Sequence, residues 1–146
     1  MSDWQEVMDA EVGKIFYDAI DNGVRILVMR GPTSMCAYLG CPKDHPLAGF
    51  EYDDIPLSVH GGLAFGGEGG KGWPAGWYWY GWDYSHSGDY STYYDRLTSE
   101  LLPEGHKWTV KEVTDEAKDA TWDFRRIMLL AEKCALKDSG LLLAKK

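Results

Sequence analysis

The sequence is poor in cysteine, and its cysteines are not spaced for cross-linking or metal binding. Only three occur in 146 residues, at Cys36, Cys41 and Cys134. The first two lie five positions apart, whereas zinc and redox sites are typically built on a C-x-x-C spacing. An odd count does not make a disulfide framework either. We therefore predict reduced thiols and a cytoplasmic location, with the cysteines packed as small hydrophobic side chains.

Long apolar runs and an excess of positive charge are also missing. No apolar stretch approaches the roughly 20 residues that a membrane-spanning helix needs, and residues 1–6 do not resemble the start of a secretory signal. Lys and Arg number 15 against 23 Asp and Glu, which gives a formal net charge of −8. Because nucleic-acid binding depends on clustered cations that neutralise phosphates, we expect neither direct nucleic-acid binding nor a membrane partner.

The length and the hydrophobic content indicate one folded domain over residues 1–146. Hydrophobic residues make up 45% of the chain, which excludes a largely disordered protein. The clearest element is a helix over residues 110–137, because Thr109 and Glu112 form a capping box and apolar residues then recur at helical spacing. The patterns predict, in chain order, a helix at 3–11, strands at 24–29, 35–41, 57–65 and 76–83, a short helix at 91–102, and the helix at 110–137.

This order of elements predicts an α+β fold. We expect a small antiparallel sheet packed by the long C-terminal helix and by the short N-terminal helix. Asp21-Asn22-Gly23 is a strong turn signal between two apolar runs, and residues 42–57 indicate an irregular loop rich in proline and acidic residues.

The unusual composition is concentrated in residues 58–95. This segment contains four of the seven Trp, six of the nine Tyr and ten of the 17 Gly. Its Gly66–Gly72 stretch is not a phosphate-binding loop, because Lys71 is followed by glycine rather than by Ser or Thr. We interpret the stretch as a hairpin tip that could close over a ligand. His60-Gly61-Gly62 has the HGG string of esterases, but the chain contains no G-x-S-x-G nucleophile elbow.

Four residues of the same segment, His60, Asp83, His86 and Asp89, are the candidate catalytic residues. Their side chains suit four roles: capping turns in a purely structural role, recognising a ligand or partner, moving protons, or binding a metal. The structural role is the plainest of the four, and we assign no metal. The sequence identifies no cofactor.

Strand register decides whether His60 and Asp83 can share a site. In a strand over 57–65, His60 lies on the same face as Gly62, and in a strand over 76–83, Asp83 lies on the same face as Trp79. A slip of one residue moves every side chain to the other face, so one register brings His60 and Asp83 together and the next separates them.

The aromatic run that begins at Trp77 has two readings. It either forms a core strand under the long helix, or it lines a ligand pocket or a protein-binding face, since Trp and Tyr anchor interfaces and stack on planar ligands. His45 is a candidate to join the central site, whereas His106 is left outside it. The predicted ligand-binding residues are His60, Trp77, Trp79, Trp82, Asp83, His86 and Asp89.

Three blocks of the sequence resemble a known pattern. They are Tyr38-Leu39-Gly40 with Pro42-x-x-His45-Pro46, then Val59-His60-Gly61-Gly62-Leu63, and then Gly81-x-Asp83-x-x-His86-x-Gly88-Asp89. Their order and spacing resemble a family of short uncharacterised phage and bacterial proteins with blocks like CGYVGVPxxHP, VHGGLT and GFDxAHxGD. The resemblance covers about residues 24–136. It departs from the family pattern at Ala37, Leu39, Cys41, Ala64, Trp82 and Ser85.

The resemblance implies an accessory, often phage-borne, protein and supplies no activity. Our leading hypothesis is a soluble, non-enzymatic accessory protein that recognises a small ligand, such as a nucleotide-like signal, or a host protein, with counter-defence as the natural role. Two alternatives are a small His/Asp-dependent hydrolase, with or without a metal, and an acidic inhibitor of a host nucleic-acid-binding protein. The sequence leaves open whether the chain forms a homo-oligomer.

Overall fold

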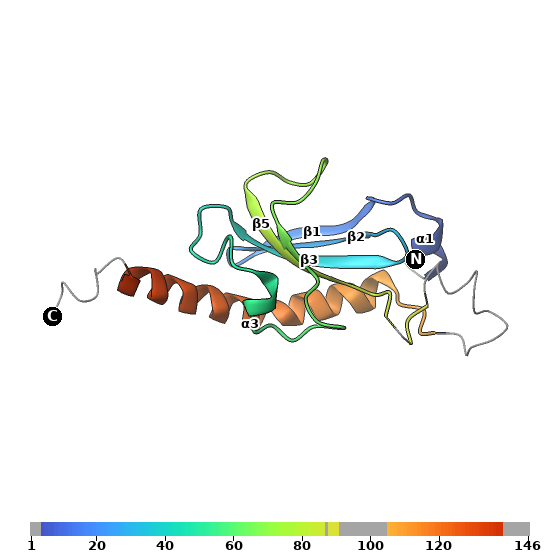
Figure 1. Cartoon of the computed structure of the whole chain (residues 1–146). Helices are drawn as coiled ribbons and strands as arrows, with labels where there is room; N and C mark the ends of the chain where they lie inside the picture. Colours follow the sequence, from blue (N-terminus) through green and yellow to red (C-terminus); the bar gives the residue numbers. More distant parts are fainter. Residues whose placement is uncertain (1–3, 87, 91–104, 139–146) are drawn as a thin grey trace.

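The fold is built on an antiparallel sheet of five strands in the order β1-β2-β3-β5-β4. The computed structural model describes residues 4–86, 88–90 and 105–138. The sheet carries one long helix and one short N-terminal helix (Figure 1), so the predicted α+β class is confirmed. The elements are α1 (Trp4–Asp9), β1 (Ile15–Asp21), β2 (Val24–Arg30), β3 (Met35–Pro42), η1 (Tyr52–Asp54), β4 (Phe65–Gly67), β5 (Trp77–Asp83) and α3 (Val110–Asp138).

The first hairpin confirms the predicted turn. Asp21 pairs with Val24, and the two residues between them, Asn22 and Gly23, have φ angles of 51° and 82°. Two successive residues with positive φ make the tight turn whose twist matches that of antiparallel strands. The apolar run before the turn forms β1, a strand that was not among the elements predicted from the sequence. The run after the turn forms β2.

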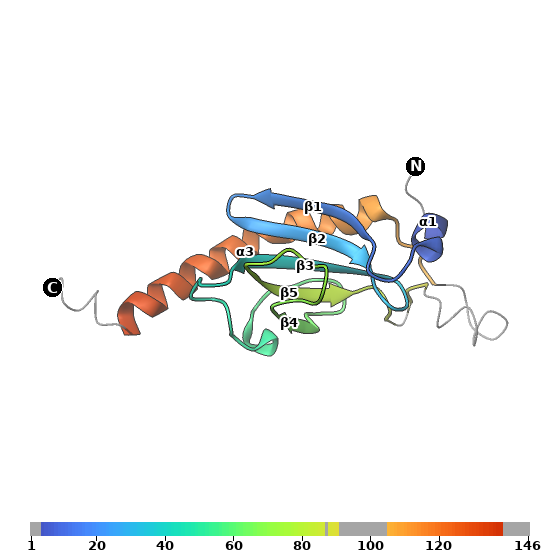
Figure 2. The same ribbon diagram turned by 90° about the horizontal axis from the view of Figure 1, so that it is seen from above.

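Helix α3 covers one face of the sheet. Figure 2, which views the molecule from above, shows the helix running diagonally behind the strands. Alternate residues of β3 and β5 point toward it, as the pleat of a strand requires. Phe124 is fully buried and its ring lies 6.2 Å from that of Tyr80. The helix begins at Val110 through the predicted capping box: the Thr109 N–H donates to the Glu112 carboxylate at 2.9 Å, and the Glu112 N–H donates to Oγ1 of Thr109 at 3.2 Å.

The opposite face of the sheet has a second, aromatic core. Leu27, Met29 and Trp79 are buried there beneath Tyr38, Phe65 and Trp73. Trp73 comes from the glycine-rich segment between β4 and β5, and its ring lies 4.5 Å from that of Tyr38 and 5.8 Å from that of Trp79. The residue that directly follows the predicted hairpin tip at Gly66–Gly72 therefore folds back and packs on the sheet.

The predicted strand over 57–65 is wrong in its extent. The strand β4 begins only at Phe65, and His60 lies in a turn in which the Gly62 N–H donates to the Val59 carbonyl at 2.9 Å. The cause is local, because Gly61 and Gly62 have φ angles of 71° and 83°, which a strand does not allow. The predicted helix at 91–102 lies outside the described residues.

The cysteines follow the prediction only in part. All three are free; Cys41 is buried, Cys36 is half-buried and Cys134 is exposed. None of the helices within the described ranges is long and apolar enough to cross a membrane.

Candidate functional site

The centre of the candidate site is the carboxylate of Asp89, which is only 3% exposed. Nε2 of His60 lies 2.8 and 3.0 Å from its two oxygens. The indole N–H of Trp108 donates to Oδ1 at 2.8 Å, and the backbone N–H of His86 donates to Oδ2 at 3.0 Å. A buried carboxylate needs such donors to offset its lost hydration, so Asp89 organises three separate segments of the chain.

A backbone bridge positions Asp89. The His106 N–H donates to the Gly88 carbonyl at 2.7 Å, and the Tyr90 N–H donates to the His106 carbonyl at 2.8 Å. The two backbone segments approach so closely at Gly105 that a Cβ on this residue would lie 2.4 Å from the backbone carbonyl carbon of Asp89. Glycine at position 105 therefore permits the bridge that places Asp89 beneath His60.

The ring of His60 packs against the ring of Tyr84. The two rings stack with centroids 4.7 Å apart and planes 6° from parallel. The Tyr84 hydroxyl donates to the Glu116 carboxylate, which also accepts the His60 backbone N–H at 3.0 Å. Burial, followed by the contact with Glu116, raises the pKa of Tyr84 well above its ordinary value, so the hydroxyl stays protonated and acts as a donor. The Trp82 indole N–H completes the chain with a 3.0 Å bond to the Tyr84 oxygen.

His86 lies beside His60, with ring centroids 5.7 Å apart. Its Nε2 is 3.2 Å from Oδ1 of Asp83, but the two groups are not aligned for a hydrogen bond. The same nitrogen is buried and has no hydrogen-bond partner among the described residues. It lies directly over Gly61, where a Cβ would come within 2.2 Å of it. Buried polar atoms are usually satisfied, and within the described part of the cluster this nitrogen is a buried polar atom that lacks a hydrogen-bond partner.

The structure thus brings His60, Asp83, His86 and Asp89 together, and the pairing of His60 with Asp83, which the sequence left open, is not the one observed. His60 bonds to Asp89, and Asp83 lies beside His86. The register argument does not apply, because His60 is outside any strand. Asp83 does lie on the same face of β5 as Trp79, as the alternation predicted.

The three candidate tryptophans are not arranged as a stacking surface. Trp79 is 0% and Trp82 is 1% exposed, and they lie in the cores on opposite faces of the sheet. Neither ring therefore presents a free face on which a planar ligand could stack, although Trp82 contributes to the lining of a pocket beside Asp83. Trp77 is partly exposed, and Arg25 lies over its ring at 5.7 Å.

The other two histidines are placed differently from the prediction. His45 is away from the cluster, with its Nε2 2.8 Å from the Glu132 carboxylate on α3. His106, which was left outside the site, lies at its edge because its ring centroid is 4.4 Å from that of Trp108. Trp108 and Glu116 are the residues that sequence reasoning missed; the capping signal placed Trp108 before the helix but could not show which loop it meets.

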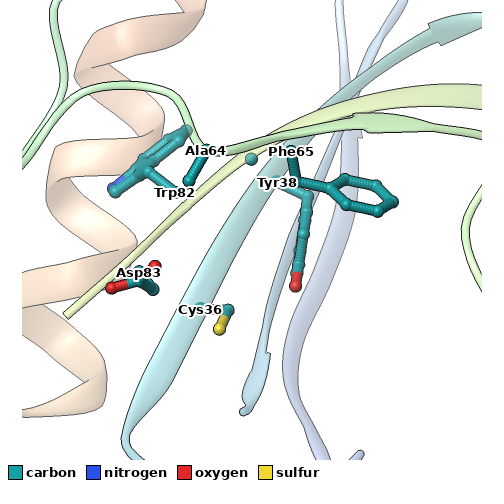
Figure 3. A pocket seen from close by; sticks show the side chains of 7 residues that line it. Cys36, Tyr38, Ala64, Phe65, Trp82 and Asp83 are labelled. Carbon is teal, nitrogen blue, oxygen red and sulfur yellow. The ribbon is translucent and has the colours of Figure 1, made fainter. Parts of the chain in front are cut away.

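A small pocket opens next to Asp83 (Figure 3). Its volume is about 80 Å³, and it is lined by Cys36, Tyr38, Ala64, Phe65, Gly81, Trp82 and Asp83. Burial, with a further contribution from Asp83, raises the pKa of the Cys36 thiol, which makes it a poor nucleophile at neutral pH. A second, open hollow of about 680 Å³ lies elsewhere, between residues 10–14 and Lys71.

No group of three or more His, Cys, Asp or Glu side chains within the described ranges is arranged to hold a metal ion. In comparisons with known proteins, no family model, no curated protein and no solved structure matches the chain. The function therefore has to be argued from the site itself.

Proposed function

We propose that this protein is a non-enzymatic, phage-type accessory protein that recognises a ligand through the cluster of His60, Asp83, His86 and Asp89. The observation that carries the proposal is the incomplete state of His86. Its Nε2 is buried without a hydrogen-bond partner in the described structure, although a carboxylate oxygen of Asp83 lies 3.2 Å away. A ligand that turns the ring slightly would align this pair, since such bonds often tighten only in a complex.

The rest of the cluster supports recognition because it is rigid. Asp89 accepts three hydrogen bonds, and His60 is fixed by stacking on Tyr84 as well as by Asp89. Binding to side chains that are already ordered avoids much of the entropy cost of association. The side chains of His60 and His86 are 26% and 38% exposed, so part of each ring is accessible from outside while Nε2 of His86 itself is buried.

Calorimetric titration of the protein with a panel of cyclic nucleotides tests the nucleotide-like version of the proposal. If the ligand is nucleotide-like, the wild type gives heat of binding and His86→Ala loses it. His45→Ala, which changes a histidine outside the cluster, is the matched control and retains binding. Absence of heat for the whole panel eliminates cyclic nucleotides as the ligand class, and equal binding by His86→Ala contradicts a role for the cluster.

Acid–base catalysis is the second candidate, and the His60–Asp89 pair favours it. A carboxylate only accepts, so a neutral His60 bonded to it donates from Nε2 and has Nδ1 as its proton-accepting nitrogen. His86, with its ring 5.7 Å away, is placed to act as the second proton-transfer group. Such a pair suits a small hydrolase that lacks a protein nucleophile and activates water.

Hydrolysis assays with chromogenic phosphate and carboxylate esters test this second candidate. An enzyme of this kind loses at least about a hundredfold in rate when His60 is changed to Gln, because general base catalysis contributes that much or more. A rate equal to the buffer blank for the wild type, in parallel with ligand binding, excludes the hydrolase and leaves recognition.

A further inference from the structure

The small pocket beside Asp83 has the size and chemistry of a receptor for one charged group. Figure 3 shows Asp83 and Tyr38 flanking it, with the Cys36 thiol between them. A volume of about 80 Å³ holds about two or three water molecules, so a terminal functional group fits and a nucleobase does not.

Asp83 is the charged residue of the pocket lining, and the buried Arg30 guanidinium lies outside the lining but near enough to act on the Cys36 thiol. The Asp83 side chain is 35% exposed, and Oδ1 accepts the Ser85 N–H at 3.1 Å. Among the described residues, His86 is the only ion-pair partner of Asp83, and no Lys or Arg of these residues lies within ion-pair distance of its carboxylate. Burial raises the pKa of both the Cys36 thiol and the Tyr38 hydroxyl, so these two pocket groups stay neutral at physiological pH.

The walls of the pocket are aromatic. Tyr38 and Phe65 meet edge to face at 5.7 Å, and Ala64 lies next to Phe65 in the lining. Aromatic faces attract cations through their quadrupole, which adds to the attraction of the carboxylate. Gly81 makes room for this arrangement, because a Cβ there would come within 2.1 Å of the Tyr38 ring.

We propose that this pocket binds a terminal organic cation, an ammonium or guanidinium group, which pairs with Asp83 and packs against Tyr38 and Phe65. The inference rests on the proposed function, because it names the chemical class of the group that the ligand presents. A cation bound to Asp83 would also lie next to His86. Binding in the pocket would therefore be coupled to the alignment of Nε2 of His86 with Oδ1 of Asp83. The cation belongs either to a free amine or to an Arg or Lys side chain of a protein.

Two probes of nearly equal shape separate charge from size. We would titrate ¹⁵N-labelled protein with methylguanidinium and with neutral methylurea, and follow the backbone amides of Ala64, Gly81 and Asp83. The expected result is saturable shifts at millimolar concentration for methylguanidinium and binding at least about tenfold weaker for methylurea. Equal binding of the two probes, or shifts located elsewhere, would overturn the proposal.

Two variants of identical net charge provide the control. Asp83→Asn removes the carboxylate of the pocket, whereas Glu68→Gln removes one that is 62% exposed on the loop between β4 and β5. Preference for the cation is lost in Asp83→Asn and retained in Glu68→Gln. Should Asp83→Asn fail to fold, Ala64→Leu, which fills the pocket with a neutral side chain, is expected to abolish binding instead. Retained cation preference in the pocket variants contradicts the proposal.

Agmatine and Nα-acetylarginine amide distinguish the two sources of the cation. Binding of agmatine alone identifies a free amine, and binding of both identifies a side chain that a protein can present; either supports the pocket assignment. If neither binds while His86→Ala still abolishes binding of another ligand, the pocket inference fails and the proposed function stands.

Discussion

Gly61 shows at the scale of one residue how the cluster depends on backbone geometry. Its φ of 71° suits glycine, and its missing Cβ leaves the space that Nε2 of His86 occupies. Gly62 also has a positive φ, of 83°, but nothing lies within 4 Å of its missing Cβ. The two neighbours therefore separate backbone strain from contact with His86.

We expect Gly61→Ala to lower the free energy of unfolding by about 2–3 kcal/mol and to displace the His86 ring. Gly62→Ala carries only the strain of a left-handed residue, about 1–2 kcal/mol, and leaves the ring in place. Urea denaturation and the ring resonances of His86 report these two effects. Identical ring resonances in both variants would show that His86 does not lie on Gly61.

Asp89 is the residue whose loss the cluster tolerates least. Asp89→Asn replaces a charged acceptor of three hydrogen bonds by a neutral one, one side of which carries N–H donors. We expect a loss of about 2 kcal/mol in urea denaturation, against less than about 1 kcal/mol for Asp83→Asn, whose carboxylate is partly exposed. Equal losses would contradict the central position of Asp89.

Residue type and spacing were enough to select His60, Asp83, His86 and Asp89 as candidates. They could not give the pairing, because the turn at Gly61 and Gly62 removes His60 from the sheet and so from any register rule. Residue type and spacing also could not predict that Trp108 and Glu116 contact the cluster. These two residues lie at the N-terminal end of α3 and bond to Asp89 and His60, which are far away in the sequence.

At the scale of elements, α3 is the part that the sequence predicts best. Its capping box and the helical spacing of its apolar residues depend only on neighbouring positions in the sequence, so they can be recognised before the fold is known. The strand over 57–65 fails for the opposite reason, since glycine conformation decides it and composition does not reveal φ. Burial of Trp79 and Trp82 agrees with the core-strand reading of the aromatic run, but the choice between the two readings depends on both layers of the fold and stayed open in the sequence.

The two aromatic residues in the middle of α3 test which face is buried. Phe124 is 0% exposed, whereas Trp122 is 66% exposed. We expect Phe124→Ala to cost about 3–5 kcal/mol and Trp122→Ala to stay within about 0.5 kcal/mol. Thermal or urea denaturation of the two variants measures the difference, and comparable losses would place the helix in another rotation.

The capping box makes the start of α3 sensitive to acid. Burial alone would raise the pKa of Glu112, but its hydrogen bonds from the Thr109 N–H and from His106 lower it below the ordinary value. A depressed pKa in the folded state gives stability that is present above the unfolded value, about 4.3, and is lost as the pH falls through the folded value.

We therefore expect the gap in stability between wild type and Glu112→Gln to shrink as the pH is lowered from about 6 to about 3. Glu68→Gln, which removes an exposed carboxylate outside the helix, serves as the control. Urea denaturation at a series of pH values measures both differences. A gap that stays constant over this range would contradict a stabilising role of the ionised Glu112 side chain.

At the scale of the whole molecule, the sheet separates a mainly aliphatic core under α3 from an aromatic core on its other face. The histidine cluster lies at and beyond the C-terminal end of β5, where loops from several parts of the chain meet. Most of the Trp and Tyr that made residues 58–95 unusual serve packing. Polar residues of the same segment form the histidine cluster. The net charge of −8 agrees with a ligand that presents a cationic group.

A fragment screen by ¹H–¹⁵N correlation NMR tests ligand recognition by this cluster most directly, because it assumes no ligand in advance. Shifts induced by the bound fragments should gather on the amides of Gly61, Asp83, His86 and Asp89 and disappear in His86→Ala. Shifts that gather instead on the hollow near Lys71 or on the exposed face of α3 around Trp122, with the cluster unmoved, would contradict it.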